Sequence, residues 1–262
     1  LARFGIKAQV ADLTDTEKLD QIIADDACLV FAEYITNPQL EVVDIKKLAE
    51  VAHKHGLPLI VDTTAVPFTD IDAHEMGIDV EVLSSTKYIS GGATSLGGLI
   101  LDFGTFEEVN QRIRFEFLFN LGTYMTPQVA YMQTLGLETL DVRYRKQAQN
   151  AFDLAHALQK LPQVKRVNYP GLALGKPLGA MLTIDLESEQ KCLDFLNQLR
   201  LIRRATNLFD NKSLAIHPYS TIFVNFTPEE KKDMDVLDTT IRLSMGLEDA
   251  DDLVDDIKQA LG

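Results

Sequence analysis

The pattern of hydrophobic and polar positions gives the first part of the chain an alternation of short apolar runs and amphipathic segments. The segment 44–56 carries apolar residues at helical spacing; Asp44 can cap its start, and Gly56 ends it. Strand, helix and strand at this spacing predict a mostly parallel α/β sheet. The runs with the length and composition of strands are ACLVFAEY (27–34), LPLIVD (57–62), DVEVLSS (79–85) and LGGLILD (96–102).

The second part of the chain has a different pattern, in which one long helix precedes a mixture of strands and helices. The segment 136–161 is expected to form that helix, because its apolar residues recur at helical spacing. We therefore divide the chain into a large α/β domain, residues 1–141, and a small C-terminal α+β domain, residues 142–262. The other elements expected in the small domain are strands at 179–186, 213–219 and 240–246 and helices at 189–200 and 249–261.

Composition and charge narrow the classes of function. The formal net charge is −14 and no basic stripe with interleaved aromatics is present, so we expect no nucleic-acid partner. No apolar run approaches the roughly 18 residues that span a bilayer, and no signal peptide is visible. We therefore expect a cytoplasmic protein without a membrane partner. The two cysteines lie far apart and the histidines lack HExxH spacing, so neither a disulfide framework nor a metal site is expected.

Polar side chains that could take part in catalysis or binding follow three of the predicted strands, at the point where each strand ends. The run LPLIVD ends on Asp62, the run DVEVLSS ends just before Lys87, and ACLVFAEY continues into ITNP with Asn37. In open parallel sheets, ligands bind beyond the carboxyl ends of the strands. We therefore expect these three polar side chains to face one crevice.

The stretch SSTKYISGGATSLGG (84–98) combines hydroxyl groups, one lysine and two glycine pairs. If Ser84–Thr86 is extended, Ser84 and Thr86 point the same way and can both donate to a phosphate, with Lys87 beside it. In a P-loop the glycines precede the lysine, whereas here they follow it, so nucleotide binding is disfavoured. The glycines are better explained by a tight turn that returns the chain to the sheet.

A lysine beside a phosphate site, with an aspartate at a neighbouring strand end, suggests pyridoxal 5′-phosphate (PLP). Lysine forms an imine with this cofactor, and a carboxylate keeps the pyridine nitrogen protonated. A free lysine has a pKa of roughly 10.4, which desolvation would lower. The alternative is a solvated loop lysine at Lys87 and a helix cap at Asp62. The combination of LIVD with S-x-T-K and a glycine-rich turn favours the cofactor site.

Four segments together resemble the Cys/Met-metabolism family of PLP-dependent enzymes. They are EYITNP, DIKKLAEVAHKHGLPLIVDTT, SSTKYISGGATSLGG and TIRLSMGLEDADDLVDDIKQAL. The family includes cystathionine synthases and lyases, methionine γ-lyase and O-acetylhomoserine sulfhydrylase. The resemblance extends over nearly the whole chain, and it implies PLP and the type I fold of aspartate aminotransferase. Residues 1–141 then correspond to the C-terminal part of the large PLP-binding domain.

The resemblance also implies roles for matching residues. Lys87 carries the cofactor as an imine and moves protons between Cα, Cβ and C4′, while Asp62 pairs with the pyridine nitrogen. The cofactor phosphate accepts from Ser84 and Thr86, and Asn37 contacts the ring substituents.

Arg242 is implied to bind the substrate α-carboxylate, which also suits the bidentate geometry of a guanidinium. Asn207 is implied to stand near the same carboxylate. From the residues alone, a surface ion pair remains the alternative for Arg242, and a turn position remains the alternative for Asn207.

The segment NLFDNKSLAIHPYST (207–221) resembles O-acetylhomoserine sulfhydrylases more than the lyases. We therefore expect γ-replacement on O-acetylhomoserine with sulfide, in methionine biosynthesis and trans-sulfuration. The alternatives are a γ-lyase of methionine or cystathionine type, an inert fragment, and, remotely, a lysine-imine aldolase without PLP. The departures from the family pattern are Thr63, Leu83, Ala93, Phe209 and Tyr219, together with a shorter segment after NYPGL.

The resemblance begins partway through the family's large domain. In the family, the preceding portion carries a glycine-containing phosphate loop, an aromatic residue that stacks on the ring, and an arm that reaches a neighbouring subunit. We therefore expect an enzyme represented without that portion, a small amino-acid substrate, and a homo-oligomer, either dimer or tetramer.

Overall fold

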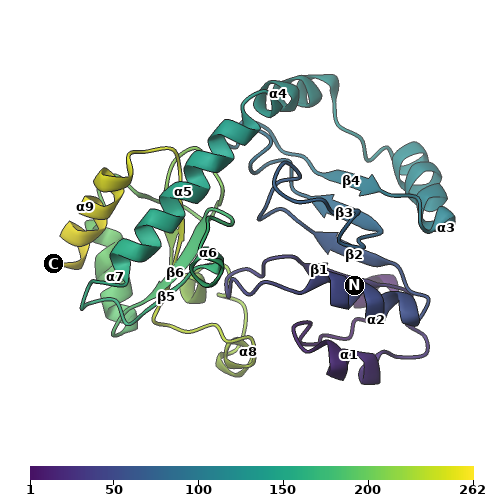
Figure 1. The fold of residues 1–262 in the computed structure, drawn as a ribbon, viewed down its shortest axis with the longest axis horizontal. Coiled ribbons are helices and arrows are strands. Elements are labelled where there is room, and N and C mark those ends of the chain that lie inside the picture. The colour runs from purple at the N-terminus through teal and green to yellow at the C-terminus, as the bar shows by residue number, and fades with distance from the viewer.

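The computed structural model describes residues 1–262 as two lobes, each built on its own β-sheet. The long helix α5 (Leu140–Leu158) runs from one lobe to the other (Figure 1). The first sheet has the order β1-β2-β3-β4, from β1 (Val30–Glu33), β2 (Leu59–Asp62), β3 (Val80–Leu83) and β4 (Leu99–Asp102). The second has the order β5-β6-β9-β8-β7, from β5 (Arg166–Asn168), β6 (Met181–Asp185), β7 (Arg203–Arg204), β8 (Leu214–Ile216) and β9 (Thr240–Ser244).

The first sheet confirms the predicted mostly parallel arrangement. β1, β2 and β3 pair in parallel, whereas β4 pairs antiparallel with β3. The chain reverses within the glycine-rich stretch after β3, and no crossover helix intervenes, so only an antiparallel partner can follow. Gly91 and Gly92 in that reversal have φ of +71° and +110°, values that glycine adopts without a steric cost.

One face of the first sheet is covered by helices. α2 (Ile45–Lys54) begins where the sequence predicts, because the Asp44 carboxylate accepts from the Lys47 amide. Its Leu48 and Ala52, both fully buried, pack in one cluster with the strand residues of β1 and β2. α1 (Thr16–Ile22) packs against α2.

The opposite face of the first sheet is much more open. Phe31 on β1 is 53% exposed and Ile100 on β4 is 56% exposed. Glu33 and Asp62, which are register partners at the ends of β1 and β2, alternate with the buried positions of their strands and lie on this face. The carboxyl ends of the strands are therefore accessible from this side.

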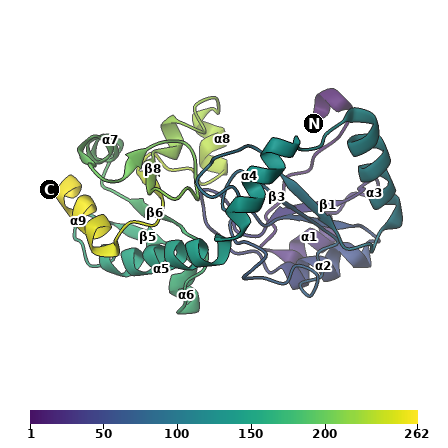
Figure 2. The ribbon, with the colours of Figure 1, turned by 90° about the horizontal axis from the view of Figure 1, so that it is seen from above.

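The central strands of the second sheet, β6, β8 and β9, are buried on both faces. Helices α5, α7 (Glu189–Gln198) and α9 (Ala250–Leu261) cover one face, where Leu182 and Phe195 are almost fully buried. In Figure 2, α5 and α9 lie side by side. The other face carries Thr183 and Arg242 of the neighbouring strands β6 and β9 toward the first lobe.

The predicted long helix at 136–161 is wrong at its start. The structure has two helices there, α4 (Pro127–Leu137) and α5, separated by a short turn. Gly136 in α4 approaches the first lobe so closely that a Cβ on it would stand 2.0 Å from the Ile89 carbonyl oxygen. This approach requires glycine, and the break between the two helices follows at the turn 138–139.

The remaining elements are short. They are η1 (Ala2–Phe4), α3 (Glu107–Gln111), η2 (Arg112–Asn120), α6 (Pro170–Leu174), η3 (Pro218–Ser220) and α8 (Pro228–Asp233). None of the helices combines the length and the apolar character needed to cross a membrane.

Candidate active site

The predicted site residues of the first lobe lie at one edge of its sheet. β1, β2 and β3 are neighbours and parallel, so Asp62 at the end of β2 lies between the segments that carry Asn37 and Ser84. Glu33 on β1 stands opposite Asp62 on β2 in the strand register. Partial burial and the charge of Asp62 raise the pKa of Glu33, whereas the hydrogen bond that Glu33 accepts from the main-chain amide of Asn37 acts in the opposite direction. This edge therefore concentrates negative charge.

Lys87 lies in a turn rather than at the end of an extended segment. The strand predicted at 79–85 is shorter than expected, because β3 ends at Leu83 and residues 85–90 form a turn, so Ser84–Thr86 is not extended. The Lys87 amide donates to the Ser84 carbonyl at 3.2 Å, and the Ser90 amide donates to the Ser85 carbonyl at 2.9 Å. The turn carries the lysine out of the sheet toward the second lobe.

The ammonium of Lys87 contacts the second lobe directly. Its Nζ donates to Oδ1 of Asn207 at 2.6 Å. Burial lowers the pKa of Lys87, and the nearby positive charge of Arg242 lowers it further, while Asp210 acts in the opposite direction. A lysine with a lowered pKa has a larger neutral, nucleophilic fraction at neutral pH.

Arg242 is held in the middle of β9 and is only 2% exposed. Its NH1 donates to Oδ1 of Asn37 at 2.9 Å, and its NH2 donates to the carbonyls of Thr206 and Asn207, each at 3.3 Å. Burial lowers the pKa of Arg242 to about 10. Because no carboxylate neutralises it, this buried cation is suited to bind an anionic group of a ligand.

The two predicted phosphate donors, Thr86 and Ser84, differ in the hydrogen bonds that their hydroxyl groups make within the protein. The Thr86 hydroxyl already bonds to the main chain of Gly97, donating to the carbonyl at 3.2 Å and accepting from the amide at 3.0 Å. The Ser84 hydroxyl has no hydrogen-bond partner within the protein, although the Ser84 amide donates to Thr64. Ser84 is thus free to donate to a ligand, whereas Thr86 holds the glycine-rich turn closed.

Thr64 is a residue that the sequence reasoning missed. Its amide donates to Oδ1 of Asp62 at 2.9 Å, and its Oγ1 accepts from the Ser84 amide at 2.8 Å. It therefore ties the carboxylate at the end of β2 to the main chain of Ser84 after β3. The only sequence signal was its place two positions after the aspartate.

Arg143 and Tyr88 were also missed, and together they anchor the lysine turn. Arg143, buried in α5, donates through NH1 to the Tyr88 carbonyl at 2.8 Å and through NH2 to the Gly136 carbonyl at 2.7 Å. The Tyr88 hydroxyl accepts from the Ala180 amide at 3.1 Å. The residue after Lys87 is thereby fixed to both α5 and the second lobe.

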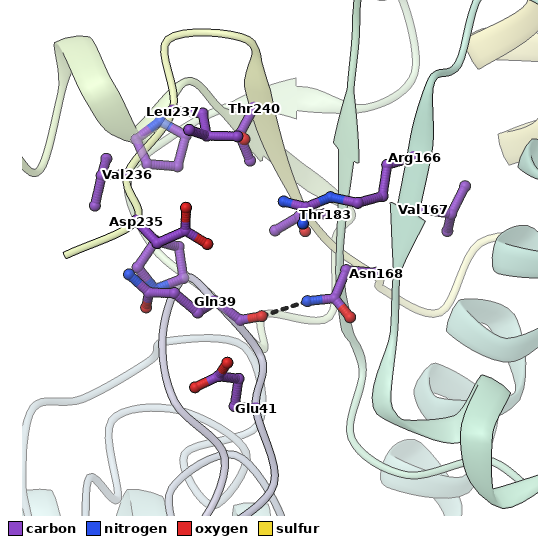
Figure 3. Close-up of a pocket in the computed structure, with 12 residues that line it drawn as sticks. Gln39, Glu41, Arg166, Val167, Asn168, Thr183, Asp235, Val236, Leu237 and Thr240 are labelled. Atoms are coloured by element: carbon purple, nitrogen blue, oxygen red, sulfur yellow. Dashed lines mark hydrogen bonds between the residues drawn. The ribbon is translucent and has the colours of Figure 1, made fainter. Parts of the chain in front are cut away.

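A pocket of about 270 Å³ lies between the segment after Asn37 and the second sheet (Figure 3). None of the predicted site residues lines it. Within it, the side-chain amide of Asn168 donates to the main-chain carbonyl of Gln39, and the side-chain amide of Gln39 donates to the main-chain carbonyl of Met234. These bonds fasten the segment that carries Asn37 to the lobe that carries Arg242, and so hold the Asn37–Arg242 contact in place.

The donor set fits PLP. Lys87 offers an amine of lowered pKa, Asp62 retains Oδ2 without a hydrogen-bond partner within the protein, and Ser84 offers an unpaired hydroxyl. Arg242 adds a buried cation that suits a carboxylate. Fold and site together define an enzyme class that combines lysine-based cofactor chemistry with amino-acid recognition.

The chain belongs to the Cys/Met-metabolism PLP-dependent enzymes, whose family model matches residues 1–262. The chain is 33% identical to an L-methionine gamma-lyase of Pseudomonas putida over 275 residues, which cover 100% of this chain and 68% of that protein. It is 30% identical to an O-acetyl-L-homoserine sulfhydrylase of Leptospira meyeri over 308 residues, covering 99% of this chain and 70% of that protein.

Solved structures agree with this assignment. An O-acetylhomoserine (thiol)-lyase of Campylobacter jejuni that contains N′-pyridoxyl-lysine-5′-monophosphate superposes with a TM-score of 0.92 at 32% identity, covering 99% of this chain and 72% of that one. An O-acetylhomoserine sulfhydrylase of Wolinella succinogenes gives a TM-score of 0.87 at 39% identity, covering 100% and 79%. The predicted fold class and the predicted PLP-dependent family are confirmed.

Proposed function

We propose that the chain catalyses γ-replacement on O-acetylhomoserine with sulfide, giving homocysteine and acetate. The observation that carries this proposal is the contact of Lys87 with Asn207, beside the buried Arg242, at the carboxyl edge of the first sheet. The resemblance of residues 207–221 to the sulfhydrylases supports it, as does the 39% identity to the Wolinella succinogenes sulfhydrylase.

In the proposed site, Arg242 binds the substrate α-carboxylate through its guanidinium fork, and Asn207 lies beside it. Lys87 binds PLP, Asp62 faces the pyridine nitrogen, Asn37 contacts the ring substituents, and Ser84 with Thr86 donates to the phosphate. Thr86 can do so only by giving up its bond to the Gly97 carbonyl.

PLP, when bound, supplies an electron sink for the carbanion at Cα. The neutral amine of Lys87 removes the Cα proton and then moves protons between Cα and Cβ. Loss of the Cβ proton to Lys87 accompanies breaking of the Cγ–O bond and release of acetate. A Cγ–S bond then forms with hydrosulfide and Lys87 returns protons to Cβ and Cα, so that the hydrosulfide taken up balances the acetate released. Burial around Arg242 keeps water from competing for the carboxylate.

Product analysis tests this proposal. The full chain, supplied with PLP and O-acetylhomoserine, should give homocysteine only when sulfide is present, and Lys87→Ala should give none. Formation of 2-oxobutanoate at the same rate with and without sulfide would instead identify a γ-lyase.

A γ-lyase is the second candidate, and one observation favours it. The methionine gamma-lyases align with this chain over 274 or 275 positions, whereas the sulfhydrylases require 301 to 308. The chain is therefore closer to the lyases in the length of its segments, in keeping with its short segment after NYPGL. An inert chain is the third outcome, and it would show no visible PLP band and no product.

We also propose that the protein forms a homo-oligomer in the cytoplasm, with a second copy covering the apolar segment 115–131. The proposal is supported by large exposed side chains that no part of the chain covers, a feature typical of interfaces. They include Phe115, Phe117, Phe119, Leu121, Tyr124 and Tyr131, between 50% and 82% exposed. Light scattering should give a dimer or tetramer that Phe119→Ser dissociates, whereas Val10→Ser, at a site 96% exposed, should not.

The boundary between residues 141 and 142 remains a proposal. It is supported by the separate sheets on either side of α5, although one buried cluster joins residues from both lobes.

A further inference from the structure

The segment 206–209 of the second lobe makes several contacts at the site. The carbonyls of Thr206 and Asn207 accept from Arg242, and Asn207 Oδ1 accepts from Lys87. Two residues later, Phe209 is 1% exposed and belongs to the cluster that joins the lobes. A single short segment thus contacts both cations of the site.

Phe209 adopts a backbone conformation that is unusual for a residue with a side chain. Its φ is +57°, in the left-handed region where glycine is favoured and where a Cβ is sterically costly. Such a conformation persists only where its surroundings hold it. Two contacts do so: the Phe209 amide donates to Ser244 Oγ at 2.7 Å, and the Phe209 ring stacks on the Tyr88 ring, with centroids 4.4 Å apart and 21° between planes.

The stack joins the two segments that meet at the site. Tyr88 follows Lys87 directly, and Phe209 lies two positions after Asn207, so the ring pair and the Lys87–Asn207 hydrogen bond are parallel links between the same segments. Tyr88 is fixed in turn by Arg143 and by the Ala180 amide. A movement of the Phe209 ring would therefore move Asn207 relative to Lys87.

We propose that Phe209 is a positioning residue, whose stack on Tyr88 holds Asn207 Oδ1 at Lys87 Nζ. The proposal rests on the proposed function only in taking Lys87 as the reactive amine. The stack fixes the position of Lys87 relative to the segment 206–209 before any substrate enters. The side chain that does so stands at a backbone position suited to glycine.

The experiment is a double-mutant cycle on the full chain without added PLP. The rate at which acetic anhydride labels Lys87, measured by peptide mass spectrometry, reports release of the amine from Asn207. Phe209→Leu, which keeps an apolar side chain but removes the ring, should raise this rate about tenfold, as expected for a lost hydrogen bond to a charged group. Asn207→Ala should raise it equally, and the double variant should show no further increase.

Phe195→Leu is the matched control. Phe195 is also 1% exposed, but it lies in the core of the second lobe. Phe195→Leu should lower thermal stability about as much as Phe209→Leu does. It should change the Lys87 labelling rate by no more than about twofold, relative to wild type when introduced alone and relative to Asn207→Ala when combined with that change. Phe209→Tyr, which keeps the ring, should retain the wild-type labelling rate.

Two results would overturn the proposal: labelling of Lys87 unchanged in a folded Phe209→Leu protein, or labelling rates that multiply in the double variant. If Phe209→Leu does not fold, Phe209→Gly takes its place in the cycle, since glycine suits the positive φ and also removes the ring. Because labelling requires no turnover, these outcomes are independent of whether O-acetylhomoserine is the substrate.

Discussion

The two lobes hold their cationic side chains in opposite ways. Arg242 stands in the middle of β9, a strand buried on both faces, and is 2% exposed. Lys87 stands in a turn after β3, at the edge of a sheet whose outer face is open, and is half-buried. The backbone of Arg242 is fixed by its strand neighbours, whereas that of Lys87 is fixed by a turn and by the side chains of Arg143 and Phe209.

This difference matches the tasks proposed for the two cations. A residue that binds a carboxylate gains from a rigid, desolvated setting, because the ion pair is then directional and strong. A residue that bonds to a cofactor and then moves protons has to change partners. A lysine side chain on a turn can do so without disturbing a sheet. The following changes test the comparison.

The largest effect is expected at Arg242. Arg242→Gln removes the buried cation, so kcat/KM for O-acetylhomoserine should fall about a hundredfold or more, mainly through KM. Arg166 is the matched control, because its side chain is 55% exposed and is paired with Asp185. Steady-state kinetics should give Arg166→Gln a kcat/KM within about twofold of wild type. Equal losses of kcat/KM in the two variants would refute the role of Arg242 in binding the substrate carboxylate.

The second test concerns the burial of the two sheets. Leu182→Ala on β6, a fully buried position, should lower the free energy of unfolding by about 2–5 kcal/mol. Ile100→Ala on β4, at a position 56% exposed, should change it by no more than about 1 kcal/mol. Urea unfolding followed by circular dichroism measures both values, and a similar loss in the two variants would mean that the outer face of the first sheet is covered in solution.

The third test uses pH. Lys87 must be neutral to bond to PLP, and its lowered pKa predicts that the uptake rate rises with pH to a midpoint below the ordinary lysine value of roughly 10.4. Arg242→Gln removes a positive charge near Lys87. Because this removal stabilises the protonated amine, the midpoint should move to higher pH. Stopped-flow absorbance of PLP at a series of pH values gives the midpoint, and a shift to lower pH would contradict the stated cause.

The smallest effects are expected at the two hydroxyl residues. Ser84→Ala should weaken PLP affinity about tenfold and leave stability unchanged, because the Ser84 hydroxyl makes no bond within the protein. Thr86→Ala should also lower the free energy of unfolding by about 1 kcal/mol, since its hydroxyl bonds to Gly97. Fluorescence titration measures PLP affinity, and thermal unfolding measures stability. Equal changes in both quantities for the two variants would contradict the distinct roles of the two hydroxyls.

The sequence predicts well what neighbouring residues determine. The strands that become β1, β2 and β3, the Asp44 cap of α2 and the closing helix α9 all follow from local periodicity and capping. The gathering of Asn37, Asp62 and Ser84 at one edge follows as well, because parallel neighbours end on the same side.

What escapes prediction depends on contacts between distant residues. Lys87 and Asn207 are 120 positions apart, and Arg242 and Asn37 are 205 apart, so no local pattern relates them. The bond between Thr86 and Gly97, 11 positions apart, closes the reversal between β3 and β4, and no local pattern indicates it. Phe209 stands out in the sequence only as a departure from the family pattern, and its stack on Tyr88 is visible only in three dimensions.

Borohydride reduction of the PLP-loaded full chain, followed by peptide mass spectrometry, identifies the lysine that bonds to PLP. We expect one pyridoxyl adduct, on the peptide that contains Lys87, and no adduct in Lys87→Ala. An adduct on another lysine, or none in the wild-type chain, would contradict this expectation.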